Sequence, residues 1–597
     1  MNEPEIAVPA QAPTSDAAFD EALLLQRQGN VPAAEQLYRA MLGRNPDHSG
    51  ALHQLSLLCL GRDEFEEAAR LLRRWIAREP NVSGAHNNLG IALKGLNRPA
   101  EAVAHFNKAI ELEPNRGETH YSLGRAQQML GRLAEARECY ERAIALRPDH
   151  PEANNALAVL LAPTEPEQAL ACFRRAIAAR PAYADGHNNM GILLHALGRD
   201  EEAVASFRRA LAIKPDHADA HNNLGLTLRD LNRHEESLRC FELAQAIEPD
   251  HVDAHVNEAL VRLALGDYAA GWKEYVWRLH SVNFSKGKKR PAQPLWLRQW
   301  DVSGRTILLH GEQGLGDTIQ FARFVPKVAA LGGKVILAVQ RPLTALMAGL
   351  AGVSVVRGQG DPVPPFDAFC PLPSLPLAFK TTLETIPADV PYLSAPADRL
   401  AKWRAVLDTL GRPRVGLMWT RGAASPQDRR SLPLRLLLPL LERRDIQFVA
   451  LQKELPDGEV ALFQSTGVPS FLGERLADLA DTAAIIAMLD LVITIDTSIA
   501  HVAGALGKPM WVLLPFSADW RWLHGRSDSP WYPTARLFRQ PAPGDWQSVV
   551  RQVAEALAVN FREVVHRPRA HGAGADIRSA PSEPVAEAKG GRSGGAD

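Results

Sequence analysis

The fold of the first half of the chain is indicated by a recurring unit, of which residues 81–114, NVSGAHNNLGIALKGLNRPAEAVAHFNKAIELEP, are one copy. Prolines close the repeated unit at steps of 33 or 34 residues, at Pro46, Pro80, Pro114, Pro148, Pro181, Pro215 and Pro249. A small residue stands 23 or 24 positions before each proline, at Ala22, Ser56, Gly90, Gly124, Ala158, Gly191 and Gly225. Such phasing predicts stacked helix pairs, since small residues allow close approach and a proline ends the second helix.

The repeated segment, residues 15–251, resembles tetratricopeptide repeats in its period, its small positions and its closing proline. An eighth, degenerate unit follows, with Ala259 in the small position and Tyr275 and Trp277 near its end. We expect a superhelix over residues 15–285, made of seven repeats and a capping unit, after a disordered N-terminus at 1–14.

One position in the first helix of the units carries asparagine, at Asn88, Asn189, Asn223 and Asn257. On the concave face of a superhelix such amides can hydrogen-bond an extended peptide backbone, or they can satisfy neighbouring groups. Histidine repeats two positions earlier in five units, at His86, His120, His187, His221 and His255. We interpret these histidines as packing residues, because successive copies lie on successive units.

Composition excludes several classes of protein. The 67 Lys+Arg against 68 Asp+Glu give a net charge of −1, which argues against a nucleic-acid partner. Five cysteines form no CxxC pair, so neither a zinc site nor a disulfide framework is indicated. The acidic start MNEPEIAV does not resemble a signal peptide, and no stretch predicts a transmembrane segment. We expect a cytoplasmic protein.

After a basic, proline-containing linker at 286–303, short aliphatic strands alternate with helical stretches. One set of strands occupies 304–410 and a second set occupies 411–562, with a helical bridge near 396–410. Alternation of this kind predicts two parallel, doubly wound sheets that face each other across a cleft at the carboxyl ends of their strands. The Gly-, Ala- and Pro-rich residues 563–597 are predicted to form a disordered tail.

Two strand-end loops carry the candidate chemistry of the second half. HGEQGLGDTIQFAR places Asp317 at a helix start, and ITIDTSIAHVAGALGKP places Asp496, Thr497 and Ser498 at another, with His501 one turn later. The chain has no GxGxxG, no GxxxxGK[ST], no DxD and no GxSxG. A dehydrogenase, a P-loop nucleotidase and a serine hydrolase are therefore disfavoured.

The half from about 305 to 558 resembles the heptosyltransferase family (glycosyltransferase family 9), which has an early strand–Gly-Asp–helix element and a later Asp-Thr-x-x-x-His-x-x-x-Ala-x-x-x-Pro-like signature. That signature is filled here by Asp496, Thr497, His501, Ala505 and Pro509. The layout of repeats before two Rossmann-like domains also resembles the O-linked N-acetylglucosamine transferases. The resemblance implies a GT-B fold, a nucleotide-sugar donor bound mainly by the second domain, inversion without a metal, and no cofactor.

By the same resemblance Asp317 is the general base, although plain N-capping explains it as well. The implied donor-binding residues are Gly314, Gly316, Thr420, Arg430, Gln452, Asp496, Thr497, Ser498 and His501. Arg429 is the alternative to Arg430, because the family has a lysine in this region. Gln452 is equally compatible with a structural role.

Two functions follow as hypotheses. The first is a glycosyltransferase whose repeat groove recruits a protein or glycan acceptor, and a repeat array favours a protein over a lipid-linked saccharide. The second is a non-catalytic scaffold for protein–protein interaction that retains a degenerate sugar-nucleotide-binding domain.

The late aromatic group Trp520, Trp522, Trp531 and Tyr532 is expected to pack onto the first α/β domain or to line a pocket.

Overall fold

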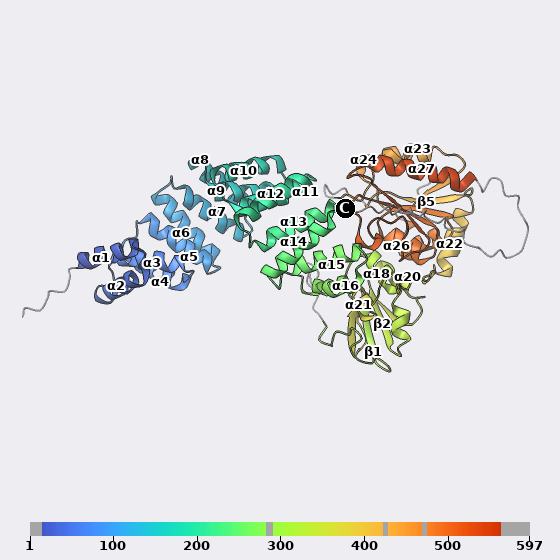
Figure 1. Ribbon diagram of the computed structural model, residues 1–597, viewed down its shortest axis with the longest axis horizontal. Coiled ribbons are helices and arrows are strands. Elements are labelled where there is room, and N and C mark those ends of the chain that lie inside the picture. The colour runs from blue at the N-terminus through green and yellow to red at the C-terminus, as the bar shows by residue number, and fades with distance from the viewer. Residues whose placement is uncertain (1–14, 282–290, 422–427, 469–474, 563–597) are drawn as a thin grey trace, which may run out of the picture.

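The computed structural model describes residues 15–281, 291–421, 428–468 and 475–562. The predicted disordered ends, 1–14 and 563–597, lie outside the described residues, as does the start of the predicted linker, 286–290. Figure 1 shows an elongated row of helices that leads into a region built around two sheets.

The row of helices is a solenoid of helix pairs, which confirms the predicted repeat architecture. In each pair the first helix is called helix A and the second helix B. The pairs are α1 (Ser15–Arg27) and α2 (Val31–Arg44), α3 (Ser49–Gly61) and α4 (Phe65–Arg78), α5 (Ser83–Gly95) and α6 (Pro99–Leu112), α7 (Gly117–Met129) and α8 (Leu133–Leu146), α9 (Pro151–Leu161) and α10 (Pro166–Ala179), α11 (Ala184–Ala196) and α12 (Asp200–Ile213), α13 (Ala218–Asp230) and α14 (His234–Ile247), and α15 (Val252–Ala264) and α16 (Tyr268–Tyr275).

The small residue of helix A is required by an aromatic ring of helix B. A Cβ atom on Gly90 would lie 2.6 Å from the ring of Phe106, and one on Gly225 would lie 2.6 Å from the ring of Phe241. Both rings are fully buried. The repeated glycine is thus the space into which the aromatic side chain of the same unit packs.

The last unit caps the solenoid by packing into the sheet region. Helix α16 continues as a short 3-10 helix, η1 (Val276–His280), and Trp272 and Tyr275 are buried in the core that the two sheets share. The indole of Trp272 donates a hydrogen bond to the carbonyl of Thr381 at 3.1 Å, and Tyr268 accepts one from the indole of Trp531 at 2.8 Å. The capping role expected for this unit is therefore supported by direct contacts to both sheet layers.

The first sheet is parallel and has the strand order β3-β2-β1-β4. Its strands are β1 (Thr306–His310), β2 (Lys334–Val339), β3 (Val353–Gly358) and β4 (Ala368–Pro371). Short helical segments connect the strands: α18 (Leu315–Ala322), α19 (Val325–Ala329), η2 (Arg341–Leu343), α20 (Thr344–Met347), η3 (Leu372–Ser374) and α21 (Leu375–Ala378). The helical stretch after β1 is divided into α18 and α19, and Pro326 lies at the start of α19, where a proline is tolerated.

The second sheet is also parallel, with the order β6-β5-β7-β8-β9. Its strands are β5 (Arg414–Met418), β6 (Gln447–Ala450), β7 (Leu491–Ile495), β8 (Met510–Leu514) and β9 (Ala535–Arg539). Its helices are α22 (Ala397–Leu407), α23 (Leu434–Leu441), α24 (Asp457–Ser465), α25 (Leu479–Ala487), α26 (Ser498–Ala505), the 3-10 helix η5 (Trp520–Trp522) and α27 (Trp546–Arg562). The second half is therefore an α/β region of two parallel sheets.

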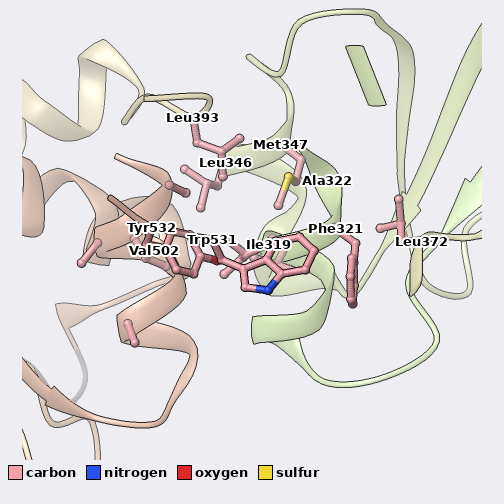
Figure 2. Close-up of a cluster of buried hydrophobic side chains, with 14 of the residues drawn as sticks. Ile319, Phe321, Ala322, Leu346, Met347, Leu372, Leu393, Val502, Trp531 and Tyr532 are labelled. Atoms are coloured by element: carbon pink, nitrogen blue, oxygen red, sulfur yellow. The ribbon is translucent and has the colours of Figure 1, made fainter. Parts of the chain in front are cut away.

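The two sheet layers share one hydrophobic core. In Figure 2, Ile319 and Phe321 of α18 lie near Trp531, which precedes β9, and Val502 of α26 lies on the other side of Trp531 from Phe321. All four side chains are fully buried. Residues 291–303, assigned to a linker by the sequence, also join this region, since Trp296 is buried and its backbone N–H donates to the carbonyl of Phe369 at 2.8 Å.

Candidate active site

A cavity of about 890 Å³ lies between the loop after β1 and the loop after β7. Both loops follow the carboxyl ends of parallel strands, where ligands bind in sheets of this type. Eight of the predicted site residues line the cavity: Gly314, Gly316, Asp317, Arg430, Asp496, Thr497, Ser498 and His501. The capping unit contributes Val256, Leu260 and Tyr275 to the same wall, so the solenoid, the first sheet and the second sheet all reach one space.

Asp317 faces this cavity from the first turn of α18. Its Oδ2 accepts the backbone N–H of Gly314 at 2.8 Å, which is the capping geometry expected for a carboxylate at a helix start. Its Oδ1 forms an ion pair with the guanidinium of Arg521. Each carboxylate oxygen has two lone pairs, so both contacts leave room for a hydroxyl of a ligand.

Arg521 joins the two sheet layers at the floor of the cavity. It is 8% exposed, donates to Gln320 at 2.6 Å and to Asp519 at 2.7 Å, and stacks on Trp520 with 4.5 Å between the guanidinium carbon and the ring centre. Burial alone would raise the pKa of Asp519, but Arg521 outweighs it and the pKa lies below the usual range. Asp519 and Arg521 were not predicted as site residues, although Asp519 caps the short helix η5, because a three-residue 3-10 helix leaves little pattern in the sequence.

Asp496 lies opposite, at the carboxyl end of β7. Its Oδ2 is 3.2 Å from the guanidinium of Arg430, whose side chain is 40% exposed. Burial raises the pKa of Asp496, and the nearby negative charge of Asp519 adds to that rise. The cavity thus contains carboxylates whose environments push their pKa values in opposite directions, a pattern found at functional sites.

The start of α26 provides hydroxyls and a neutral imidazole. Thr497 caps the helix, its Oγ1 accepting the N–H of Ile499 at 3.3 Å. His501 Nδ1 lies 2.8 Å from the hydroxyl of Tyr532, and burial together with the charge of Arg521 lowers the pKa of His501 to about 3. A Cβ on Gly316 would lie 2.5 Å from His501 Cδ2, so α18 and α26 meet at van der Waals contact here.

Two of the predicted donor-binding residues, Thr420 and Gln452, do not line the cavity. Gln452 is buried, and its amide donates to the carbonyls of Thr420 and Glu454 at 2.9 Å each, while its Oε1 accepts the N–H of Thr420 at 3.3 Å. These bonds tie the end of β6 to the end of β5. The structural interpretation of Gln452 accounts for its position, and Arg421 next to Thr420 reaches the cavity instead.

The capping unit holds the Gly-rich loop of the first sheet. Arg278 is fully buried, pairs with Glu312 at 2.6 Å and donates to Ser374 at 2.6 Å. The amide of Gln313 donates to the hydroxyl of Tyr275 at 2.8 Å. The sequence gives only a weak signal for these contacts, namely charged and aromatic residues that depart from the repeat pattern in the last unit.

The four predicted groove asparagines each bond another asparagine rather than standing free. The Nδ2 group in one unit donates to the preceding unit's asparagine: Asn189 to Asn155 at 3.1 Å, Asn223 to Asn188 at 3.1 Å, and Asn257 to Asn222 at 3.0 Å. Asn88 accepts from Asn87 at 3.3 Å. The amides therefore form a lateral ladder between neighbouring A helices, which corresponds to the structural alternative.

The ladder stops where the sequence breaks the pattern. Ser122 occupies the donor position of its unit, and Oδ1 of Asn87 in the preceding unit is buried with no hydrogen-bond partner among the described residues. A short hydroxyl cannot reach as far as an amide. The break thus leaves an unsatisfied acceptor, which costs stability.

The repeated histidines close each unit onto the one before it. Nε2 of His86 lies 2.9 Å from the carbonyl of Pro80, and that of His255 lies 2.8 Å from the carbonyl of Pro249. The same contact, 2.9 to 3.2 Å long, is made by His120, His187 and His221. A carbonyl only accepts, so Nε2 carries the proton and these side chains act in packing.

A second cavity of about 750 Å³ adjoins the first and lies between the helices of the last repeat units, such as α11, α13 and α15, and loops of the second sheet. Both cavities are lined by Leu260, Arg421, Arg430, Asp519 and Trp520. The cavity beside the solenoid and the cavity that holds Asp317 and Asp496 are therefore neighbours with these five side chains in common.

The described ranges contain neither a cluster of metal ligands nor a membrane-spanning helix. No three His, Cys, Asp or Glu side chains in them are arranged to hold a metal ion. None of the helices that the structure describes has the length and apolar character needed to cross a bilayer.

Three family models match the repeats, and one curated protein is similar to about half of the chain. Residues 25–89 and 94–160 match a model described as tetratricopeptide repeat, residues 193–228 one described as TPR repeat, and residues 218–251 a further tetratricopeptide repeat model. Protein FlbA of Caulobacter vibrioides is 31% identical over 323 residues, which cover 50% of this chain and 54% of FlbA. The chain thus spans about half the length of this curated relative.

Solved structures match the same region. YrrB, titled a TPR protein with an unusual peptide-binding site, is 24% identical with a TM-score of 0.27, covering 31% of this chain and 96% of YrrB. A thermophilic TPR protein of Thermus thermophilus is 27% identical with a TM-score of 0.27, covering 30% of this chain and 100% of that protein. The N-terminal part of this chain, up to about residue 260, is an array of tetratricopeptide repeats.

Proposed function

We propose that the chain is a glycosyltransferase that moves a sugar from a nucleotide-sugar donor to a hydroxyl of an acceptor held by the repeats. The observation that carries this proposal is that Asp317 and Asp496, from different sheets, line one cavity of about 890 Å³. That volume suits a ligand of nucleotide-sugar size. A GT-B arrangement of the two sheet layers is part of the proposal.

The proposed step forms a bond between the acceptor hydroxyl oxygen and the anomeric carbon of the sugar. The bond from that carbon to the diphosphate oxygen breaks, and the electron pair leaves with the nucleoside diphosphate. The hydroxyl proton passes to the carboxylate of Asp317. Arg430 and the N-terminal end of α26, which both reach the cavity, offset the negative charge of the leaving group.

The donor is identified by thermal shift of the full chain against ADP-, GDP-, UDP-, dTDP- and CMP-linked sugars, with the free nucleotides as controls. A ligand that binds only the folded state stabilises it by about 2.7 kcal/mol at a hundred times its Kd. A selective rise in melting temperature with one nucleotide sugar supports the proposal. A folded protein that responds to no member of the panel contradicts it.

Catalysis by Asp317 is tested with Asp317→Asn. The amide oxygen can still accept the Gly314 N–H, so the helix cap is preserved while proton transfer is lost. We expect transfer to fall at least about a hundredfold, with the donor-induced thermal shift retained.

The chain provides a matched control for this variant. Asp361 accepts the N–H of Gly358 at 3.0 Å in the turn after β3 and pairs with Arg341 at 3.1 Å, the same two kinds of contact that Asp317 makes, but it lies outside the cavity. Asp361→Asn should therefore transfer at the wild-type rate. Equal rates for wild type, Asp361→Asn and Asp317→Asn would assign Asp317 to capping alone.

One observation favours the scaffold as a second candidate. Both oxygens of Asp317 already have partners within the protein, Gly314 and Arg521, and these contacts explain the residue without catalysis. A scaffold predicts that Asp317→Asn lowers stability while leaving partner binding unchanged. The panel and the transfer assay together separate the two candidates.

A further inference from the structure

The inner face of the last repeats carries three rows of side chains besides the site described above. In α11 the residues Asp185, Asn189 and Ile192 are spaced i, i+4 and i+7, so they lie on one stripe of the helix. Helices α13 and α15 repeat the stripe with Asp219, Asn223 and Leu226, and with Asp253, Asn257 and Leu260. Ile192 and Leu260 line the cavity of about 750 Å³, so the aliphatic edge of the stripe borders that space.

The aliphatic row extends through most of the solenoid. It consists of Leu57, Ile91, Val159, Ile192, Leu226 and Leu260, with Arg125 in one unit. Val159 is 42% exposed and Ile192 is 45% exposed. Single exposed aliphatic side chains are ordinary, but a row that repeats once per unit and ends at a cavity is typical of a binding surface.

The amide row between the other two is occupied by its own lateral hydrogen bonds. The Nδ2 groups of Asn189, Asn223 and Asn257 each donate to an asparagine of the preceding unit. A ligand therefore finds fewer free amide donors than the sequence suggests. The side chains left to select a ligand are those on either side of the amides.

The acidic row loses its arginine partners where it approaches the cavity. Farther away, Glu118 pairs with Arg147 at 3.1 Å, and Glu152 pairs with Arg180 at 2.6 Å. Nearer to the cavity, the side chains of Asp185 and Asp219 are 65% and 71% exposed, and each lies 3.3 to 3.4 Å from a histidine of the next unit instead. Acidic residues in the first turn of a helix also interact favourably with the helix dipole. That interaction does not explain why Asp185 and Asp219 lack the arginine partners that Glu118 and Glu152 have.

We infer that this stripe binds an extended polypeptide that carries aliphatic and basic side chains and leads a serine or threonine to the cavity. The acidic and aliphatic rows are seven positions apart on each A helix, which corresponds to about 10 Å. One extended chain fits in this interval, over the row of amides. Basic side chains then face the aspartates, and aliphatic ones face Ile192 and its equivalents. Only the delivery of the hydroxyl rests on the proposed transferase function.

The test measures binding of a labelled peptide to the full chain by fluorescence anisotropy, without any donor. The probe is a peptide of about twelve residues that alternates Lys, Val and Ser, long enough to cross several units at about 3.3 Å per residue. Two matched probes replace Lys by Glu or Val by Gly. We expect the first probe to bind at least about tenfold more tightly than either replacement, and more weakly as salt increases.

Two variants locate the binding surface. Asp185→Asn combined with Asp219→Asn should weaken the Lys probe about fivefold, and Ile192→Ser should weaken it by a similar factor. The matched controls are Asp149→Asn, whose side chain is 74% exposed, and Leu243→Ser on α14, where Leu243 is 49% exposed. Neither control residue lies on the stripe, so both should bind like wild type.

Several results would overturn the inference. Equal binding of the three probes, equal losses in stripe and control variants, or displacement of the Lys probe by a neutral oligosaccharide would each do so. The salt series on the wild-type protein keeps the test decisive even if a variant fails to fold, because a salt-independent affinity contradicts charge pairing. These outcomes are independent of the donor panel, so failure here is distinguishable from failure of the proposed function.

Discussion

Replacing Arg521 by glutamine should destabilise the protein strongly, because this one side chain holds two carboxylates from different sheet layers. It pairs with Asp317 of the first layer and with Asp519 of the second, the latter at 2.7 Å. It also donates to Gln320 at 2.6 Å and stacks on Trp520. Glutamine keeps part of the volume and some hydrogen bonding but removes the positive charge.

The expected loss follows from the burial of the groups involved. Removing one partner of a buried ion pair costs about 3–5 kcal/mol, and a partly desolvated cation–π contact adds up to about 2 kcal/mol. The side chains of Asp317 and Asp519 are 20% and 29% exposed, so water compensates in part. We therefore expect a loss of about 3 kcal/mol at pH 7, and a smaller loss for Arg521→Lys, which retains the charge.

The loss should depend on pH with a definite sign. In the wild type, Arg521 keeps the pKa of Asp519 below its usual value against the effect of burial. That stabilisation is present above the unfolded pKa of about 3.9 and is lost as the pH falls through the folded value. Without Arg521, burial raises the pKa of Asp519 instead, so the variant loses stability as the pH rises above about 4.

Urea unfolding of wild type, Arg521→Gln and Arg521→Lys at pH 7 and at about pH 4.5 measures both effects. The difference between wild type and Arg521→Gln should be larger at pH 7. A difference below about 1 kcal/mol, or one that is the same at both values of pH, would refute the argument that Arg521 compensates buried negative charge.

Three further predictions concern packing, the amide ladder and acid sensitivity. Gly316→Ala should cost about 1–3 kcal/mol in thermal unfolding, because the new methyl group would meet His501, and an unchanged Tm would contradict close contact of α18 with α26. Ser122→Asn should stabilise by about 1 kcal/mol by donating to Oδ1 of Asn87, whereas Ser122→Ala should give no such gain. The pKa of His501 is lowered to about 3 by burial and by Arg521, so the unfolded state takes up the proton first and stability should fall between about pH 6.5 and 3. His501→Gln should flatten that part of a pH–stability profile, and an unchanged slope would contradict a buried neutral imidazole.

Much of the architecture could be predicted from the sequence because it follows from periodic patterns. The spacing of the prolines and small residues gives the solenoid, and the aliphatic runs give eight of the strands. The convergence of Asp317 and Asp496 was also predictable, since carboxyl ends of parallel strands face the same side of their sheets. The strand β9 was not predicted, because the arginines of ARLFR obscure its short apolar pattern.

The contacts that the sequence did not reveal are those between segments far apart in the chain, because they depend on how these segments are aligned in the fold. Arg521 and Asp317 are 204 positions apart, and nothing near either residue indicates the other. The asparagine ladder has the right residues at the right period, but which groups they bond depends on how far one A helix is displaced against the next. Gln452 has the residue type of a nucleotide contact, yet its amide is used by the carbonyls of Thr420 and Glu454.

The capping unit gives the solenoid a fixed direction toward the cavity, and this has a consequence for function. Trp272 is buried in the core that the two sheet layers share, and Arg278 pairs with Glu312 in the loop that precedes Asp317. Groups in a close-packed core cannot shift without loss of contacts, so the capping unit and the loop are held together. A polypeptide bound along the last units would then enter the cavity at the same place each time. Such positioning would hold the acceptor and the donor in one complex, so that they react without having to meet in solution. Contacts between the polypeptide and the repeats, although far from the reacting atoms, would in this way increase the rate.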